Sequence, residues 1–300
     1  MVGTYSIIAV DLERNEMGAA VQSHWFSVGN IVVWAEAGVG VVATQSIVNG
    51  RYGPLGLAML RNRLNPKEVI EAMTSIDAAR EYRQVAVINT IGETHAYTGS
   101  KCIPFAGHRI GKGFSVQANL VEGQEVIDSM YEAFESNEGN LADRLMTALE
   151  NAEKAGGDIR GSQSAALIVV KINATGDPLI DKVIDIRVDD NPNPIYELKR
   201  LLRIQKAYNK ANEAEQLLSR GLKDEALETY EHACSLAPEA SELRFWKAIT
   251  LFNCGEKEEA KALLRKEIKE NARYGKLLKR LINSRFLETL DELEKILEES

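Results

Sequence analysis

The sequence predicts an α+β domain with antiparallel sheets, followed by an all-helical domain. Three observations predict it: a change of composition near Asn191–Pro194, the order of the segments before that point, and a repeat after it. Residues 1–195 hold 19 of the 22 glycines and 6 of the 7 prolines. Residues 196–300 are rich in Leu, Glu, Lys and Ala, which favour helix over strand. We therefore predict domains at 1–193 and 196–300, with the Asn-Pro-Asn-Pro segment as a stiff joint.

Strand-like and helix-like segments follow one another in blocks along the first domain. Alternating or continuous β-branched and apolar residues predict strands at 4–10, 17–23, 31–37, 38–46, 84–90, 93–99, 114–120, 164–172 and 183–190. Helices are predicted at 54–75, where Asn65-Pro66 and Glu68 open a second helix, and at 122–155. Strands, helices, strands, helices and strands in this order indicate antiparallel sheets, since regular βαβ alternation is missing.

A repeat of 34 residues organises the second domain. Small and apolar residues recur at this offset: Ala214, Leu217, Gly221 and Ala226 are followed by Ala248, Leu251, Gly255 and Ala260. Small residues let two helices approach closely, and glycine allows the turn between them. The pattern resembles the tetratricopeptide repeat, with one unit at about 207–240 and a second at about 241–274.

The segment 276–299 alternates apolar and charged residues at helical spacing, so we expect it to cap the repeats. Two repeats and a cap are short for a solenoid, which usually needs three units. Seven apolar residues exceed what one capping helix needs: Leu277, Leu278, Leu281, Ile282, Phe286, Leu287 and Leu290. They predict a homo-oligomer that assembles through this face. The alternative is that the face packs on the first domain of its own chain.

Charge and composition exclude several classes of function. The chain carries 36 Lys and Arg against 44 Asp and Glu, a net charge of −8, so we expect no nucleic-acid partner. We expect no membrane partner, because no apolar run is long enough to span a bilayer and the first residues lack the basic region of a signal peptide. Three scattered cysteines predict neither disulfides nor a metal site. These features predict a cytoplasmic protein without metal or cofactor.

Several short motifs of the first domain occur together in a fixed order. They are TYSIIAVD (4–11), GVGVVATQS (38–46), YGP (52–54), YRQ (82–84), YTG (97–99), QANL (117–120), GDIRGSQS (157–164) and VDD (188–190). Over residues 3–200 this set resembles the family called domain of unknown function 1028, which is placed in the N-terminal-nucleophile (Ntn) hydrolase superfamily. The resemblance implies a four-layer αββα sandwich of two antiparallel sheets with helices outside.

The resemblance also implies a candidate nucleophile. Ntn enzymes attack amides with a Thr, Ser or Cys that is the first residue of the mature chain, and its own α-amino group is the base. An α-amine has a pKa of about 8, so it needs little tuning for this task. Here Thr4 follows Gly3, so it becomes the nucleophile only if the Gly3–Thr4 bond is cleaved. The alternative is that Thr4 and Ser6 are ordinary strand residues and the domain is catalytically silent.

A glycine-rich loop carries the next candidates, which are Asp158, Arg160 and Gln163. Glycine frees a loop to bring backbone amides near an anion, and Arg160 offers a fork for a carboxylate. The alternative is an Asp158–Arg160 pair that only anchors the loop.

Further polar residues stand at predicted strand ends. Gln117 and Asn119 face the same side of one strand, and Asn119 could donate to an oxyanion. Two amides that satisfy each other inside the sheet are the alternative. Gln45 and Tyr52 could line the same cleft as Thr4. The Ser23-His24 pair is weak evidence, since catalytic pairs are set in space rather than in sequence.

These residues lead to two hypotheses of different classes. The first is an Ntn-type hydrolase of a small amide-containing metabolite, or a non-catalytic descendant of one. Thr4, Ser6 and Asn119 would be catalytic, and Gln45, Tyr52, Gln117, Asp158, Arg160 and Gln163 would bind the substrate. The second is a binding or scaffold protein whose helical repeats recruit a protein partner or drive self-association. A mature chain that begins at Thr4 favours the enzyme.

Overall fold

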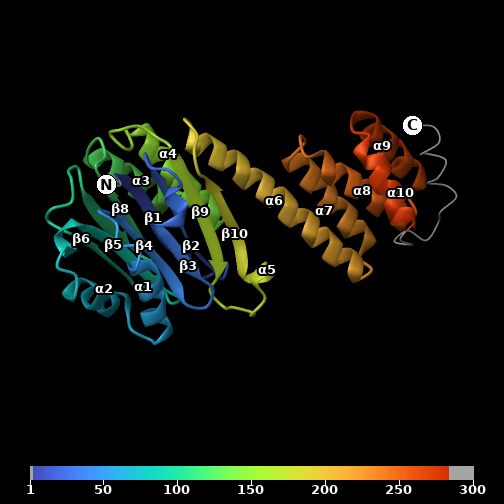
Figure 1. Ribbon diagram of the computed structural model, residues 1–300. Coiled ribbons are helices and arrows are strands. Elements are labelled where there is room, and N and C mark those ends of the chain that lie inside the picture. The colour runs from blue at the N-terminus through green and yellow to red at the C-terminus, as the bar shows by residue number, and fades with distance from the viewer. Residues whose placement is uncertain (1–2, 284–300) are drawn as a thin grey trace. The chain divides into compact units, whose positions relative to one another are not determined.

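The computed structural model describes residues 3–283, and the chain forms two compact units, Met1–Leu202 and Arg203–Ser300 (Figure 1). All strands of the described residues lie in the first unit, and the second is helical. The first unit ends at Leu202, past the Asn-Pro-Asn-Pro segment, because Ile195, Leu198 and Leu202 are buried in its core.

Two antiparallel sheets form the centre of the first unit. The six-stranded sheet has the order β10-β9-β2-β1-β8-β7, and the four-stranded sheet has the order β3-β4-β5-β6. The strands of the first are β1 (Thr4–Asp11), β2 (Glu16–Ser23), β7 (Gly107–Gly111), β8 (Phe114–Asn119), β9 (Ser164–Lys171) and β10 (Lys182–Val188). Those of the second are β3 (Val33–Glu36), β4 (Gly40–Ser46), β5 (Arg83–Asn89) and β6 (Thr94–Thr98).

Helices cover the outer faces of both sheets (Figure 1). Helices α1 (Tyr52–Arg61) and α2 (Pro66–Ser75) pack on the four-stranded sheet, and α3 (Gln124–Ser136) and α4 (Leu141–Lys154) pack on the six-stranded sheet. Asn65 and Glu68 form a reciprocal capping box that starts α2, as the sequence predicts. Apolar side chains such as Ile8 and Ile88 fill the space between the sheets.

Two elements escape the sequence pattern. Strand β7 is half-exposed at a sheet edge and reads GHRIG, so it lacks the apolar alternation that signals a strand. The second is the four-residue helix α5 (Pro178–Asp181), which Asp177 caps. Two short 3₁₀ segments occur: Val28–Asn30 lies between β2 and β3, and Arg80–Tyr82 lies between α2 and β5.

The second unit consists of helical segments in its described part. Helix α6 (Pro194–Ser219) begins in the first unit, and α7 (Lys223–Leu236), α8 (Ser241–Cys254), α9 (Lys257–Glu270) and α10 (Arg273–Asn283) follow. Gly221 and Gly255 adopt left-handed backbone (φ 80° and 100°) after α6 and α8, where a side chain would be strained. No helix within residues 3–283 combines the length and the apolarity that crossing a bilayer requires.

The apolar face predicted to drive assembly is partly accounted for within the second unit. Leu278 and Ile282 of α10 are buried in a cluster with Phe245 and Leu264, and Leu277 and Leu281 pack against it. The remaining predicted positions, Phe286, Leu287 and Leu290, lie outside the described residues. Self-association stays a prediction.

Candidate functional site

The strand register gathers polar residues at one end of the paired sheets, here called the Thr4 end. Thr4 lies opposite Ser23 on β2 and opposite Asn119 on β8. In the other sheet Gln45 on β4 lies opposite Gln84 on β5. All five side chains are buried, with Asn119 the most exposed at 2%. Neutral polar groups therefore replace the apolar packing that fills the rest of the space between the sheets.

Gln84 holds this end together through its amide. Its Nε2 donates to Thr98 Oγ1 (2.8 Å), to the Gly107 carbonyl (3.0 Å) and to the Ala118 carbonyl (2.9 Å). Its Oε1 accepts from Gln45 Nε2 (2.8 Å) and Asn119 Nδ2 (3.1 Å). One side chain of the four-stranded sheet thus clamps the backbone of the six-stranded sheet.

The predicted residues Ser6, Gln45 and Gln117 form the second half of the network. The Ser6 hydroxyl donates to Gln45 Oε1 (2.6 Å) and accepts from Gln117 Nε2 (2.7 Å). Ser115 donates to Gln117 Oε1 (3.0 Å). Gln45 Nε2 also approaches the carbonyls of Thr4 (3.4 Å) and Gln117 (3.3 Å). These groups are engaged with one another, which fits a positioning role for Ser6 better than the predicted catalytic one, and for Gln117 better than the predicted substrate binding.

The peptide bond between Gly3 and Thr4 lies beside two hydrogen-bond donors. The Gly3 carbonyl accepts from the Ser23 hydroxyl and from Arg160 Nη2 (3.0 Å). The Thr4 hydroxyl donates to Ser23 Oγ at 3.3 Å. The hydroxyl of Thr4, that of Ser23 and the carbonyl that precedes Thr4 therefore form one continuous chain.

A buried carboxylate fixes Arg160 in this position. The Asp158 side chain is fully buried and pairs with the guanidinium through two bonds, at 2.9 Å to Nε and 2.6 Å to Nη2. It also accepts from the backbone amides of Arg160 (3.0 Å) and His24 (3.1 Å). Gly161 follows with a left-handed backbone (φ 96°), which a residue with a side chain would rarely adopt. The loop thus aims one nitrogen of Arg160 at the Gly3 carbonyl.

Such an arrangement can polarise a carbonyl and move a proton. Two donors on one carbonyl oxygen stabilise the negative charge that develops there when a nucleophile attacks its carbon. The Thr4 hydroxyl is the adjacent hydroxyl that is chemically able to attack, and Ser23 can accept its proton while donating its own to the carbonyl oxygen. The Asp158–Arg160 pair is thus a loop anchor and a donor at once.

Two predicted residues bond elsewhere. Tyr52 packs with Val42 and Val85 on the outer face of the four-stranded sheet, and its hydroxyl donates to Asp77 (2.9 Å). Burial and that carboxylate raise the Tyr52 pKa, and the Arg83 bond holds the Asp77 pKa well below its usual range. Gln163 donates to Asp190 (3.1 Å). Neither side chain bonds to Thr4 or Arg160 in the described part of the chain.

Sequence reasoning gave too little weight to Ser23 and did not select Gln84, Tyr5 or Glu153. Ser23 and Gln84 gain their roles only from register, since the residues they contact lie on other strands. On the far side of β1, the Tyr5 hydroxyl donates to Glu153, which also accepts from Ser162 (2.5 Å). Burial, and next Glu153, raise the Tyr5 pKa. The nearest hint of this polar network in the sequence is the Gln-Ala-Asn pattern of β8, because a buried strand seldom carries two amides.

A cavity of about 550 Å³ opens beside the network. It is lined by the segments Thr98–Ser100 and Pro104–His108 together with Cys102. Thr98 connects it to the network, because its hydroxyl bonds both Gln84 and His108 Nδ1 (2.8 Å). Burial, and next His95, lower the His108 pKa, and burial raises the Cys102 pKa. A neutral imidazole and a protonated thiol suit an uncharged polar ligand.

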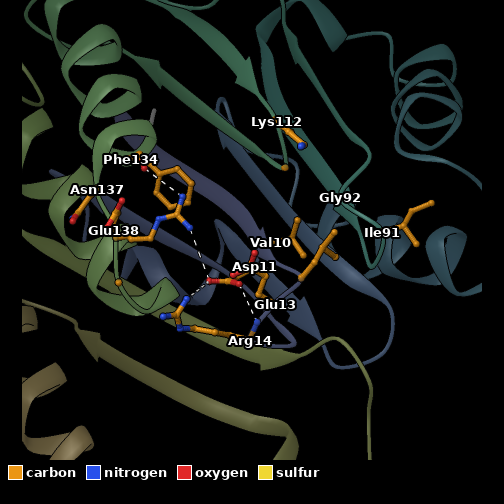
Figure 2. A pocket seen from close by; sticks show the side chains of 14 residues that line it. Val10, Asp11, Glu13, Arg14, Ile91, Gly92, Lys112, Phe134, Asn137 and Glu138 are labelled. Carbon is orange, nitrogen blue, oxygen red and sulfur yellow. Dashed lines mark hydrogen bonds and ion pairs between the residues drawn. The ribbon is translucent and has the colours of Figure 1, made fainter.

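The opposite end of the sheets, here called the Asp11 end, holds a second cavity of about 710 Å³ (Figure 2). Its polar side chains are mostly ions, together with the amide of Asn137. Figure 2 shows the Asp11 carboxylate facing Arg14. Its Oδ2 lies 3.3 Å from Arg14 Nη1 and 4.0 Å from Arg144 Nη1. Lys112, Glu13 and Glu138 complete the lining charges. These charges of both signs balance one another.

The described residues contain no group of three or more His, Cys, Asp or Glu side chains arranged to hold a metal ion. The side chains gathered at the Thr4 end offer hydroxyls, amides and the Arg160 guanidinium with its Asp158 carboxylate.

Comparison with known proteins identifies the family. Residues 4–198 match the model of "Family of unknown function (DUF1028)", and the chain belongs to this family. The crystal structure of a protein from Silicibacter pomeroyi, described as a member of the same family, is similar: 30% identity over 68% of this chain and 85% of that one, with a TM-score of 0.62. No curated protein matches the chain.

Proposed function

We propose that the first unit is an Ntn-type hydrolase of a small amide-containing metabolite, with Thr4 as its nucleophile. The observation that carries the proposal is the Gly3 carbonyl, which accepts from Ser23 and Arg160 next to the Thr4 hydroxyl. A peptide bond held in this way is poised for attack by the hydroxyl that follows it. The two sheets with helices on both outer faces are consistent with the αββα sandwich of that superfamily.

The first step would expose Thr4. Thr4 Oγ1 attacks the Gly3 carbonyl carbon, its proton passes to Ser23 Oγ, and the Ser23 proton passes to the carbonyl oxygen. Collapse of this intermediate breaks the carbon–nitrogen bond, and the proton returns to the Thr4 nitrogen, which leaves an ester between Gly3 and Thr4 Oγ1. Water hydrolyses the ester and releases the preceding segment with a new carboxyl group.

The freed amine would then serve later substrates. The Thr4 amine takes the proton of its own hydroxyl as that oxygen attacks the substrate amide, and it delivers the proton to the leaving amine. Arg160 and Ser23 occupy the position of donors to the substrate oxygen. Asn119 lies opposite Thr4 on the neighbouring strand. Its amide can become a third donor to the substrate oxygen if it gives up its hydrogen bond to Gln84.

The test compares the purified protein with Thr4→Ala and Thr4→Ser on a panel of small chromogenic amides. We expect the native chain to hydrolyse amides and Thr4→Ser to keep this activity. In Thr4→Ala the rate of hydrolysis should fall by about 10³-fold or more, because without a nucleophile the remaining residues can only bind the transition state. Equal rates for the native chain and Thr4→Ala would rule Thr4 out as nucleophile. An enzyme that needs no Thr4 would use a different set of residues.

A second candidate function is protein binding by the helical unit, which we propose as tetratricopeptide-like. A cavity of about 410 Å³ lies between α6 and α8, and its lining includes Asn212, Trp246 and Asn253. Exposed asparagines can pair with the backbone of an extended peptide. Titration of a peptide array onto the full chain tests this, with Asn212→Leu expected to lose binding and Gln216→Leu, on the same helix outside the cavity, expected to keep it.

The cytoplasmic location predicted from the sequence remains a prediction.

A further inference from the structure

Gly3 occupies a slot that admits no side chain. A Cβ built on it would lie 2.8 Å from Arg160 Nη2, 2.9 Å from Leu120 Cβ and 2.9 Å from Leu120 Cδ2. Real Cβ atoms essentially never approach neighbours this closely, so a larger residue needs both walls to move. Gly3 itself is buried.

The Leu120 wall is fixed by its backbone. Leu120 adopts left-handed backbone (φ 53°), which is uncommon for a residue with a side chain and marks a strained position. Its amide donates to the Ile103 carbonyl (3.0 Å), and its carbonyl accepts from the Ile159 amide (3.2 Å). The position of its Cβ follows from this anchored backbone, so a change of side-chain rotamer cannot clear the slot. Arg160, the other wall, is held by the buried Asp158 carboxylate.

In the proposed reaction the Gly3 acyl group stands where the acyl group of any later substrate must stand. The substrate oxygen replaces the Gly3 oxygen between Ser23 and Arg160, and the carbon next to that carbonyl replaces the Gly3 Cα. The walls that exclude a Cβ from Gly3 therefore exclude an L-configured branch at the same carbon of the substrate.

We infer that the site is selective for amides of glycine-like acyl groups, whose carbon next to the scissile carbonyl carries no L-configured branch. This inference rests on the proposed function, because it needs Thr4 to attack at the Gly3 position. It adds the substrate class: N-acylglycyl amides are accepted, and the corresponding alanyl amides are rejected. One added methyl group in a closed pocket changes the specificity ratio by about 10- to 200-fold.

The test uses two matched reactions. In the first, N-acetylglycyl and N-acetyl-L-alanyl p-nitroanilides are compared by kcat/KM for the native chain and for Leu120→Gly. Glycine removes the blocking Cβ and tolerates the left-handed backbone, so the variant is expected to fold. Arg63→Gly is the control, since Arg63 is exposed and also left-handed (φ 71°) in the loop after α1.

The second reaction is cleavage of the chain itself, followed by intact mass during cell-free synthesis. Gly3→Ala is expected to slow cleavage before Thr4 by at least about tenfold. Gly3→Ala with Leu120→Gly is expected to recover part of that loss, because the Leu120 wall is removed while Arg160 Nη2 stays 2.8 Å from the added Cβ. This pair requires no external substrate and keeps Thr4, Ser23 and Arg160 unchanged.

The expected ratio of kcat/KM for the glycyl over the alanyl amide is at least about tenfold in the native chain and in Arg63→Gly. In Leu120→Gly this ratio is expected to fall toward unity. Equal use of glycyl and alanyl amides by a chain that does begin at Thr4 would overturn the inference and leave the proposed function standing. A native chain that neither cleaves itself nor hydrolyses either amide would overturn the proposed function, and the inference with it.

Discussion

At the Thr4 end of the first unit most polar side chains are neutral amides and hydroxyls, whereas at the Asp11 end most are ions. The Thr4 end buries Gln45 and Gln84 completely and gives each several partners. At the Asp11 end the Arg14 side chain is 48% exposed, and its partner carboxylate is 7% exposed. Both ends are formed by turns and strand ends of the same two sheets.

The difference supports our proposal that the Thr4 end is the reactive one. Buried neutral donors keep their positions without solvent screening, so they can stabilise charge that appears only during a reaction. Exposed ion pairs are screened by water and contribute little to position or stability. The Asp158–Arg160 pair at the Thr4 end is held by a fully buried carboxylate.

The largest expected effect is on catalysis at the Thr4 end. Arg160→Gln removes one donor from the carbonyl oxygen, and we expect amide hydrolysis to fall by about 10²- to 10³-fold. Arg109→Gln is the matched control, because that arginine pairs with Asp128 (2.7 Å) on the surface. Initial rates at saturating substrate measure both. An Arg160→Gln enzyme as fast as the control would remove Arg160 from the mechanism.

The second effect is on stability. Gln84→Leu keeps the volume but leaves several buried groups unpaired, and we expect the free energy of unfolding to fall by about 3 kcal/mol. Gln124→Leu, whose amide makes an exposed bond to Asp128 (3.1 Å), should change it by less than about 0.5 kcal/mol. Urea denaturation gives both values. Similar losses in the two variants would contradict the idea that the Gln84 network holds the sheets together.

A charged cluster just outside the Thr4 end should give a pH signature. The Arg83 guanidinium lowers the Asp77 pKa in the folded chain. The ionised Asp77 carboxylate therefore contributes fully to the free energy of unfolding above the unfolded pKa of about 4, and this contribution is lost as the pH falls below that value toward the folded pKa. The difference in unfolding free energy between the native chain and Asp77→Asn should therefore shrink from pH 5 to pH 2. Stability curves of constant separation over this range would show that Asp77 keeps its ordinary pKa.

The smallest effect is expected at the Asp11 end. Arg14→Ala removes a largely exposed partner of Asp11, and we expect a change below about 1 kcal/mol in stability and none in amide hydrolysis. Thermal unfolding and the chromogenic assay measure the two quantities. A loss of activity here would mean that the ionic end takes part in the function, which would reverse the comparison.

The fold was largely predictable from the sequence, whereas the site was predictable only in part. The spacing of apolar residues and the composition predict strands, and most of the strands follow such a pattern. Strand β7 carries one apolar side chain at a sheet edge, so its sequence does not predict a strand. Thr4, Asp158 and Arg160 stand in recognisable motifs and do meet around the Gly3 carbonyl. Tyr52 also stands in a motif, yet it faces the helices rather than the other sheet.

Register explains what the sequence could not supply. Ser23 matters because β1 and β2 place it opposite Thr4, and Gln84 matters because β5 faces β8 across the space between the sheets. A shift of either strand by one residue would turn these side chains to the other face. No local pattern around Ser23 or Gln84 contains that information, because each partner lies on a different strand.

The most direct test of the central claim is the mass of the N-terminal peptide of the purified full-length protein. We predict that tandem mass spectrometry finds a chain that begins at Thr4, and that the Thr4→Ala variant keeps the peptide bond after Gly3 intact under the same conditions. A native chain in which Gly3 remains joined to Thr4 after prolonged incubation would contradict the claim that the Thr4 end is an amide-cleaving site.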